Sequence, residues 1–131
     1  MAKVTLPMKI FVFGNEILET DNLAPSLMLE LSSRFPDIEF IHADPTENWW
    51  QGEKELVILD TVVGIKKVTV FNSLDAFEKQ AQITPHDYDV YMDLLLMLKM
   101  GHVQKIKIVG IPDSQDRKLI DNLIQAISEL V

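Results

Sequence analysis

The sequence predicts an α/β fold, a three-layer α/β/α sandwich built around a five-stranded, mostly parallel sheet with one antiparallel strand. The first observation is a pair of continuous apolar runs at 8–13 and 55–60, which are typical of strands buried on both faces. The second is that amphipathic helical segments separate most of the strand-like runs, as they do in βαβ units. A flavodoxin-like fold fits this pattern equally well.

The third observation is the run at 67–71, whose side chains alternate as in a half-exposed edge strand. Only the segment 61–66 joins it to the run before it, and that segment is too short for a helical crossover. We therefore expect 67–71 to be antiparallel to the other strands. The two remaining strands are expected at 38–43 and 105–111.

The first expected helix begins near Asn22 or Leu23 and ends at Pro36. Pro25 is tolerated in its first turn, where the missing N–H has no helical partner. The apolar residues recur at helical spacing and predict a buried stripe of Leu23, Leu27, Met28, Leu31 and Phe35.

Two more helices are expected in the second half of the chain. One runs from Pro85 to about Met100, with Thr84 and Asp87 as a capping box and Gly101 as its end. Its predicted buried face is Val90, Leu94, Met97 and Leu98. The last, about 115–130, is predicted to bury Leu119, Leu123, Ile127 and Leu130. The polar connection 72–84 has room for a helical turn.

The amino-acid composition limits the kinds of site and partner that the protein can have. The 131 residues are expected to form one domain, 1–131, and the lack of cysteine excludes disulfides, thiolate metal ligands and thiol catalysis. The net charge of −8 repels phosphate backbones, so no nucleic-acid partner is expected. No membrane-length apolar run and no leader are evident, which predicts a cytoplasmic protein without membrane contact. The core faces account for the apolar residues, which predicts a monomer.

The candidate site lies where the first predicted strand stops at Gly14 and Asn15. A strand that ends in such a turn and leads into a helix places the turn at the carboxyl edge of the sheet, where ligands usually bind. Asp60 ends the run 55–60 and is expected at the same edge, and Asp21 is expected beside the positive end of the first helix. Both acids also have a purely structural explanation, as turn formers or helix caps.

His86 is the residue that favours a metal site. It is expected in the first turn of its helix, on the same side as Asp21 and Asp60, where the positive helix end keeps imidazole neutral and able to bind metal. Two carboxylates and one neutral imidazole suit nickel, zinc or iron. No local motif such as HExxH is present, so spacing alone is a weak argument. His42 and His102 are weaker candidates.

Trp49 and Trp50 lie together in an acidic, polar loop. Exposed tryptophans commonly mark a surface that binds a partner, and we assign both to substrate binding on this ground. The alternative, that one or both fold back onto the sheet, is about equally supported.

Four segments, in this order, carry a resemblance to a known family: FGNEILETDNLAPSL (13–27), ELVILDTVVG (55–64), TPHDYDVYMDLLLML (84–98) and KIKIVGIPDSQ (105–115). Together they resemble the hydrogenase maturation proteases, which process the large subunit of nickel–iron hydrogenases. The resemblance runs from Met8 to the last helix.

The resemblance implies a fold of the phosphorylase/hydrolase-like type, with a largely parallel five-stranded sheet and one antiparallel strand. It also implies an endopeptidase that recognises nickel already inserted in the large-subunit precursor and then removes a C-terminal extension. The nickel is supplied by the substrate, and no organic cofactor is expected. The family's metal-associated acid, acid and histidine correspond by motif to Asp21, Asp60 and His86, which are the expected catalytic and metal residues.

The sequence departs from the family in one region. The usual Gly-x-Gly-Asn has Val12 in place of its first glycine, Thr20 and Asp21 replace the usual paired acids, and Asn22 to Ala24 replace a glycine-rich segment. The expected ligands are retained. A water activated by the metal, or by a carboxylate acting as general base, would cleave the peptide, and Gly14 and Asn15 would hold the scissile carbonyl or shape the loop.

Two kinds of rival remain. A non-catalytic homologue would check for metal or bind a protein with the same fold, and a simpler binding module would use the acids only as caps. Peptidyl-tRNA hydrolases also have a Gly-Asn turn after the first strand with a histidine nearby, but the net charge of −8 disfavours tRNA.

Overall fold

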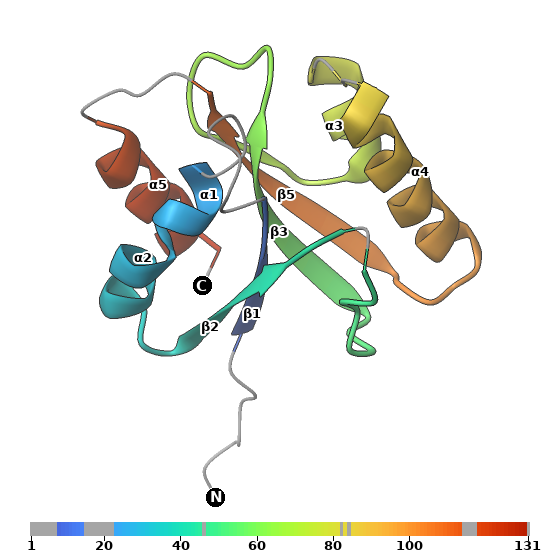
Figure 1. Cartoon of the computed structure of the whole chain (residues 1–131), viewed down its shortest axis with the longest axis horizontal. Helices are drawn as coiled ribbons and strands as arrows, with labels where there is room; N and C mark the ends of the chain where they lie inside the picture. The colour runs from blue at the N-terminus through green and yellow to red at the C-terminus, as the bar shows by residue number, and fades with distance from the viewer. Residues whose placement is uncertain are drawn as a thin grey trace, which may run out of the picture.

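The computed structural model describes residues 8–14, 23–45, 47–81, 83, 85–113 and 118–130, without the side chains of His86 and Asp87. Within these residues the chain forms one five-stranded sheet in the order β2-β1-β3-β5-β4, with helices on both faces (Figure 1). The strands are β1 (Met8–Phe13), β2 (Ile38–Ala43), β3 (Glu55–Val62), β4 (Thr69–Phe71) and β5 (Lys105–Pro112). The predicted α/β sandwich is therefore confirmed.

Strand direction also follows the prediction. β1 pairs in parallel with β2 and β3, and β3 pairs in parallel with β5. Only β4 pairs antiparallel among these five strands, with Phe71 opposite Ile108 in β5. The bounds of β1 and β2 are the predicted ones, whereas β4 begins two residues later than expected, at Thr69 rather than Lys67.

One face of the sheet is covered by α1 (Leu23–Ser26), α2 (Met28–Arg34) and α5 (Leu119–Ser128). The predicted stripe packs there, with Leu31 fully buried and the other four members partly buried against the same cluster. From α5, Leu119, Leu123 and Ile127 are buried as expected. This second core cluster also takes Ile10 and Val12, the β1 side chains that point to this face.

The first helix was predicted to be continuous, and this was wrong. It is interrupted at Leu27, where the backbone N–H bonds to the carbonyl of Ala24 at 3.1 Å. In a continuous α-helix that N–H would bond to the carbonyl of Leu23, but the Ser26 hydroxyl donates to that oxygen at 2.6 Å. Competition by a serine side chain for a backbone acceptor therefore divides the helix into α1 and α2.

The opposite face is covered by α3 (Leu74–Gln80) and α4 (Pro85–Lys99). The polar connection thus holds a whole short helix, capped by Ser73, whose hydroxyl accepts from the N–H of Ala76 at 3.0 Å. α4 occupies nearly its predicted range, and its predicted face packs into the core. It ends as expected at Gly101, whose φ of 78° completes a Schellman turn in which the His102 N–H bonds to the Met97 carbonyl at 3.0 Å.

The crossover from β2 to β3 passes over the α3–α4 face, and its described residues, 44, 45 and 47–54, form no helix (Figure 1). Its aromatic residues supply the apolar layer that a helix would otherwise provide: Trp49 contacts the rings of Phe11 and Phe13, each with ring centroids 5.1 Å apart. Near the start of β1, the Lys9 ammonium lies 3.2 Å from the Glu53 carboxylate. The acidic loop is thus fixed along β1.

No helix in the described part of the chain has the length and apolar character needed to cross a membrane.

Candidate functional site

The topology creates a switch point between β1 and β3. The chain leaves β1 through α1 and α2 on one face and returns to β2, whereas it leaves β3 through β4, α3 and α4 on the other face and returns to β5. Because these connections depart to opposite sides, a crevice is expected outside the carboxyl ends of β1 and β3. Gly14 and Asp60 stand at those two ends.

Asp60 was predicted to be the last residue of its strand, and this was wrong. β3 continues through Thr61 and Val62, which pair with Ile111 and Pro112 of β5. The pairing with β1, in contrast, extends only as far as Val12 with Leu59. Asp60 is therefore the first residue of β3 beyond those pairs, which keeps it at the carboxyl end of the β1–β3 pair as the sequence analysis expected.

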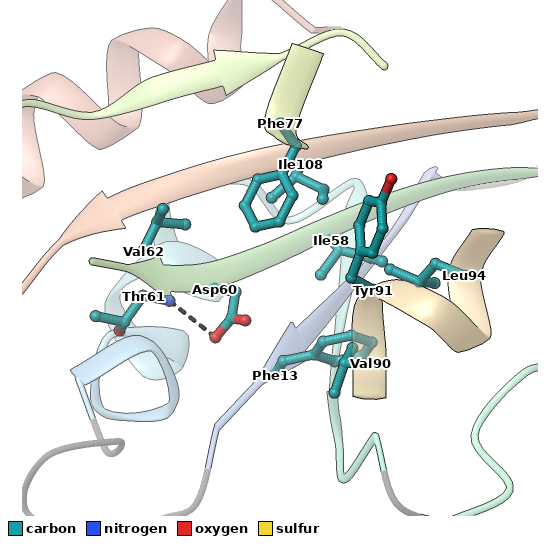
Figure 2. Close-up of a pocket in the computed structure, with 10 residues that line it drawn as sticks. All are labelled: Phe13, Ile58, Asp60, Thr61, Val62, Phe77, Val90, Tyr91, Leu94 and Ile108. Atoms are coloured by element: carbon teal, nitrogen blue, oxygen red, sulfur yellow. Dashed lines mark hydrogen bonds between the residues drawn. The ribbon is translucent and has the colours of Figure 1, made fainter. Parts of the chain in front are cut away.

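The Asp60 carboxylate points to the α3–α4 face. It follows Leu56 and Ile58 in the alternation of β3, and both of these are buried in the core cluster on that face. The Thr61 N–H donates to Asp60 Oδ1 at 2.9 Å, which fixes the carboxylate at the strand (Figure 2). Asp60 is half-buried, so a partner approaching the edge of the sheet can reach it.

A small cavity of about 20 Å³ adjoins Asp60. It is lined from β1, β3, β5, α3 and α4 by Phe13, Ile58, Asp60, Thr61, Val62, Phe77, Val90, Tyr91, Leu94 and Ile108 (Figure 2). This volume is close to the minimum that holds one water molecule. A polypeptide substrate would therefore lie outside the cavity, along the edge of the sheet, and only a water or a single side-chain group would enter.

Tyr91 is the lining residue that the sequence analysis missed. Its ring borders the cavity, but its hydroxyl points away from Asp60 (Figure 2) and donates to Glu78 Oε2 at 3.0 Å. Burial, and then this hydrogen bond and the nearby negative charge of Glu78, raise the pKa of Tyr91 above its ordinary value. The bond ties α3 to α4 beside the cavity. In the sequence, Tyr91 lies next to Val90 and three residues before Leu94, on the predicted buried face of this helix. That position could have identified it as a buried residue.

The Gly14 turn is held by His42, which the sequence analysis ranked low. The φ of Gly14 is 144°, a conformation that side-chain-bearing residues rarely adopt, so glycine is required there. His42 Nε2 lies 2.7 Å from the Gly14 carbonyl oxygen. Because a carbonyl oxygen can only accept, Nε2 carries the hydrogen. His42 thus belongs to the same sheet edge as Gly14.

The expected ligand set is only partly described. Asp21 and Asn15 lie outside the described residues, as does the side chain of His86. The backbone of His86 is described, and it is the second residue of α4, whose start lies on the same side as the carboxyl end of β3 (Figure 1). The part of the chain that the structure describes contains no group of three His, Asp or Glu able to hold a metal. The assignment of Asp21, Asp60 and His86 as ligands remains a prediction.

Both tryptophans fold back onto the protein, which was one of the two alternatives. Each is partly buried against the core cluster under α3 and α4. Trp50 Nε1 donates to the Glu53 carbonyl at 2.9 Å, and its ring centroid is 5.5 Å from that of His102. Trp50 therefore lies toward the start of β3, away from Asp60. These contacts give both residues a packing role, and their role in substrate binding remains a prediction.

No protein-family model matches the chain, and no curated protein matches it either. Among solved structures, the chain is similar to an uncharacterized protein from Wolinella succinogenes, with a TM-score of 0.57 and 16% identity over 95% of this chain and 96% of the other. At this identity the similarity supports the α/β fold over 95% of the chain and says nothing of activity.

Proposed function

We propose that the protein is an endopeptidase that removes the C-terminal extension of a nickel-loaded [NiFe] hydrogenase large-subunit precursor. The observation that carries the proposal is the position of Asp60, a half-buried carboxylate at the switch point of the sheet, beside the Gly14 turn. The four-segment resemblance supplies the substrate class. The compartment in which such a precursor matures is the cytoplasm.

In this proposal the metal-binding side chains distinguish a precursor that contains nickel from one that does not. Nickel held by substrate thiolates would gain oxygen and nitrogen ligands from Asp21, Asp60 and His86, a donor set that suits this metal. A precursor without nickel offers nothing to these side chains and would not be bound productively. The small cavity beside Asp60 has room for one water, the nucleophile that hydrolysis requires.

The test is the intact mass of a nickel-loaded precursor before and after incubation with the protein. Loss of a C-terminal fragment is expected with the wild type and not with Asp60→Asn or Asp21→Asn. The side-chain amide in Asp60→Asn would keep an oxygen that can accept from the Thr61 N–H, so the strand is expected to stay intact and the loss is attributable to the charge. A nickel-free precursor is the matched substrate control. An unchanged mass with several nickel-loaded precursors would reject the peptidase.

A second function is favoured by one observation. Asp60 is the only carboxylate among the ten residues that line the cavity. If Asp60 binds the metal, these residues provide no second carboxylate to serve as general base. A non-catalytic homologue that checks for metal, or binds the precursor, would need no such base. It predicts that the nickel-loaded precursor co-elutes with the protein, that the nickel-free precursor does not, and that neither changes mass.

A further inference from the structure

β2 forms one edge of the sheet, and its outer side is open. It pairs with β1 along its whole length, from Met8 with Ile38 to Phe13 with Ala43, and among the described residues no strand pairs with its other side (Figure 1). Successive peptide groups of a strand point to alternate sides, so about half of the N–H and C=O groups of β2 point away from β1. Such an edge can pair with an extended segment of another chain. The other edge strand, β4, has only three residues and offers a shorter template.

The register of the sheet connects this open edge with the candidate site. Ala43, the last residue of β2, pairs with Phe13 of β1. The pairing of Val12 with Leu59 places the next residue of β3, Asp60, at the level of Phe13. The ends of three adjacent strands thus form one row from the open edge to the Asp60 carboxylate. A segment added to β2 would lie three strand spacings from β3, about 14 Å, which about four extended residues span.

The path along this row crosses the Gly14 turn. Gly14 has a φ of 144° and no Cβ, so a crossing chain can approach its backbone closely. His42 of β2 holds the Gly14 carbonyl oxygen at 2.7 Å, which fixes the turn to the edge strand itself. A chain that leaves β2 past Ala43 would therefore meet a fixed surface on its way to Asp60.

The charges around β2 have one sign. Residues 35–53 include no Lys or Arg, and four of their acids are exposed: Asp37, Glu39, Asp44 and Glu47. Lys9, which lies beside Glu39 on β1, is already held by Glu53 at 3.2 Å. A basic segment is therefore complementary to this edge. A second copy of β2 would instead bring acids against acids, which disfavours it as the occupant.

We propose that β2 binds an extended, basic segment of the substrate precursor as an additional strand, from which the chain continues past the Gly14 turn to Asp60. The inference rests on the proposed function, which supplies a polypeptide that must reach Asp60. It adds a docking site about four residues from the cleaved bond. Main-chain hydrogen bonds would hold the segment whatever its side chains, and the acids beside β2 would select for basic ones. This docking does not require nickel.

Hydrogen–deuterium exchange of the whole chain, followed for each amide by NMR, tests the additional strand. In the free protein, the amides of 38–43 that point to β1 are expected to exchange slowly and the alternate amides quickly. The probe is a synthetic peptide, in excess, that spans the cleaved bond of a precursor which the protein cleaves or retains. Without nickel the peptide is not cleaved under the proposed function, so it stays intact. The peptide is expected to slow exchange of the fast amides and to leave the slow set unchanged.

Neutralising one acid tests the charge selection. Glu39→Gln is expected to weaken peptide binding by about two- to five-fold, the range of exposed ion pairs. The control, Asp93→Asn, makes the same change in net charge at an exposed acid of α4, away from β2 (Figure 1), and is expected to bind as the wild type does. Thermal unfolding of both variants checks that each is folded.

The possible failures are distinguishable. A precursor that is cleaved or retained while its peptide leaves the β2 amides unchanged would overturn the docking site and leave the proposed function standing. Equal affinities of Glu39→Gln and Asp93→Asn would also overturn it, as would protection of β2 that grows with protein concentration without peptide, because a second copy would then occupy the edge. If no precursor is cleaved or retained, the proposed function and this inference fail together.

Discussion

The hydroxyl of Tyr91 in α4 donates a hydrogen bond of 3.0 Å to the carboxylate of Glu78 in α3. Its burial and this contact raise the pKa of Tyr91 in the folded protein above the ordinary 10.0 of the unfolded chain. A group whose pKa is raised by folding contributes its full stabilisation at every pH well below the pKa that it has in the unfolded chain. That stability is lost as the pH rises from about 10 through the folded pKa.

Tyr91→Phe is therefore expected to lower the free energy of unfolding by about 0.5–1.5 kcal/mol at neutral pH, the usual net value of one hydrogen bond. Above pH 10, the wild type is expected to lose stability faster than the variant, so the difference between them narrows. Urea denaturation of both proteins across this range measures the difference in the free energy of unfolding. Parallel curves for wild type and Tyr91→Phe would contradict the account.

Trp49 is expected to matter to stability more than Trp50. Its ring contacts both Phe11 and Phe13, and so covers β1 where the described part of the crossover forms no helix. Trp49→Ala should lower the free energy of unfolding by about 2–4 kcal/mol, somewhat less than for a fully buried tryptophan. Trp50→Ala should cost about 1–3 kcal/mol, since it loses the bond to the Glu53 carbonyl, the ring contact with His102 and its partial burial on the core cluster, but no contact with two core rings. Chemical denaturation compares the two.

Variants of Trp49 can distinguish a role in packing from a role in substrate binding. If the indoles bind substrate, a conservative Trp49→Phe variant that keeps the fold should still weaken precursor binding. Full binding by a stable Trp49→Phe protein would leave only the packing role. A Trp49→Ala protein as stable as the wild type would instead contradict the packing account.

Position 110 in β5 has room for glycine only, because neighbouring side chains on the same face of the sheet lie close to it. It lies opposite Asp60 in β3, and a Cβ there would be 2.9 Å from Phe71 Cε2 and 3.0 Å from Val62 Cγ2. Gly110→Ala is therefore expected to cost about 1–3 kcal/mol through overpacking. Adding Phe71→Leu, which removes the ring atom in the way, should make the double variant less unstable than the sum of the two single changes. A thermal-unfolding double-mutant cycle tests this, and strict additivity would count against the close contact.

The sequence predicted the end of a strand correctly where a turn residue such as glycine follows the last paired residue of that strand. β1 runs from Met8, which follows Pro7 in the sequence, to Phe13, which precedes Gly14, and both bounds are as expected. The polar side chain of Asp60 led to the wrong end for β3. Backbone pairing between β3 and β5 continues to Val62, because it does not depend on the polarity of the side chain. The break at Leu27 was not predictable by periodicity either, since it depends on which carbonyl the Ser26 hydroxyl takes.

The location of the candidate site could be inferred from chain order, but its contacts could not. Gly14 and Asp60 are placed at one edge by the parallel strands that precede them, which is a property of topology. The bond from Tyr91 to Glu78 depends on α3, which the sequence analysis treated as a connection. The contact of His42 with Gly14 depends on the β1–β2 register, which places His42 opposite Val12. Such contacts are set by tertiary packing.

His42 provides the last prediction, since its Nε2–H is the donor that holds the carbonyl of Gly14 at 2.7 Å. His42→Phe removes the donor, and the expected cost in free energy of unfolding is about 0.5–1 kcal/mol, because the residue is exposed and water can replace the bond. The larger effect is expected on processing of a nickel-loaded precursor, because the turn beside Asp60 loses its support. His42→Gln, which retains an N–H donor, should recover much of the activity. Equal activities of the two variants at equal stability would show that the bond to Gly14 does not position the site.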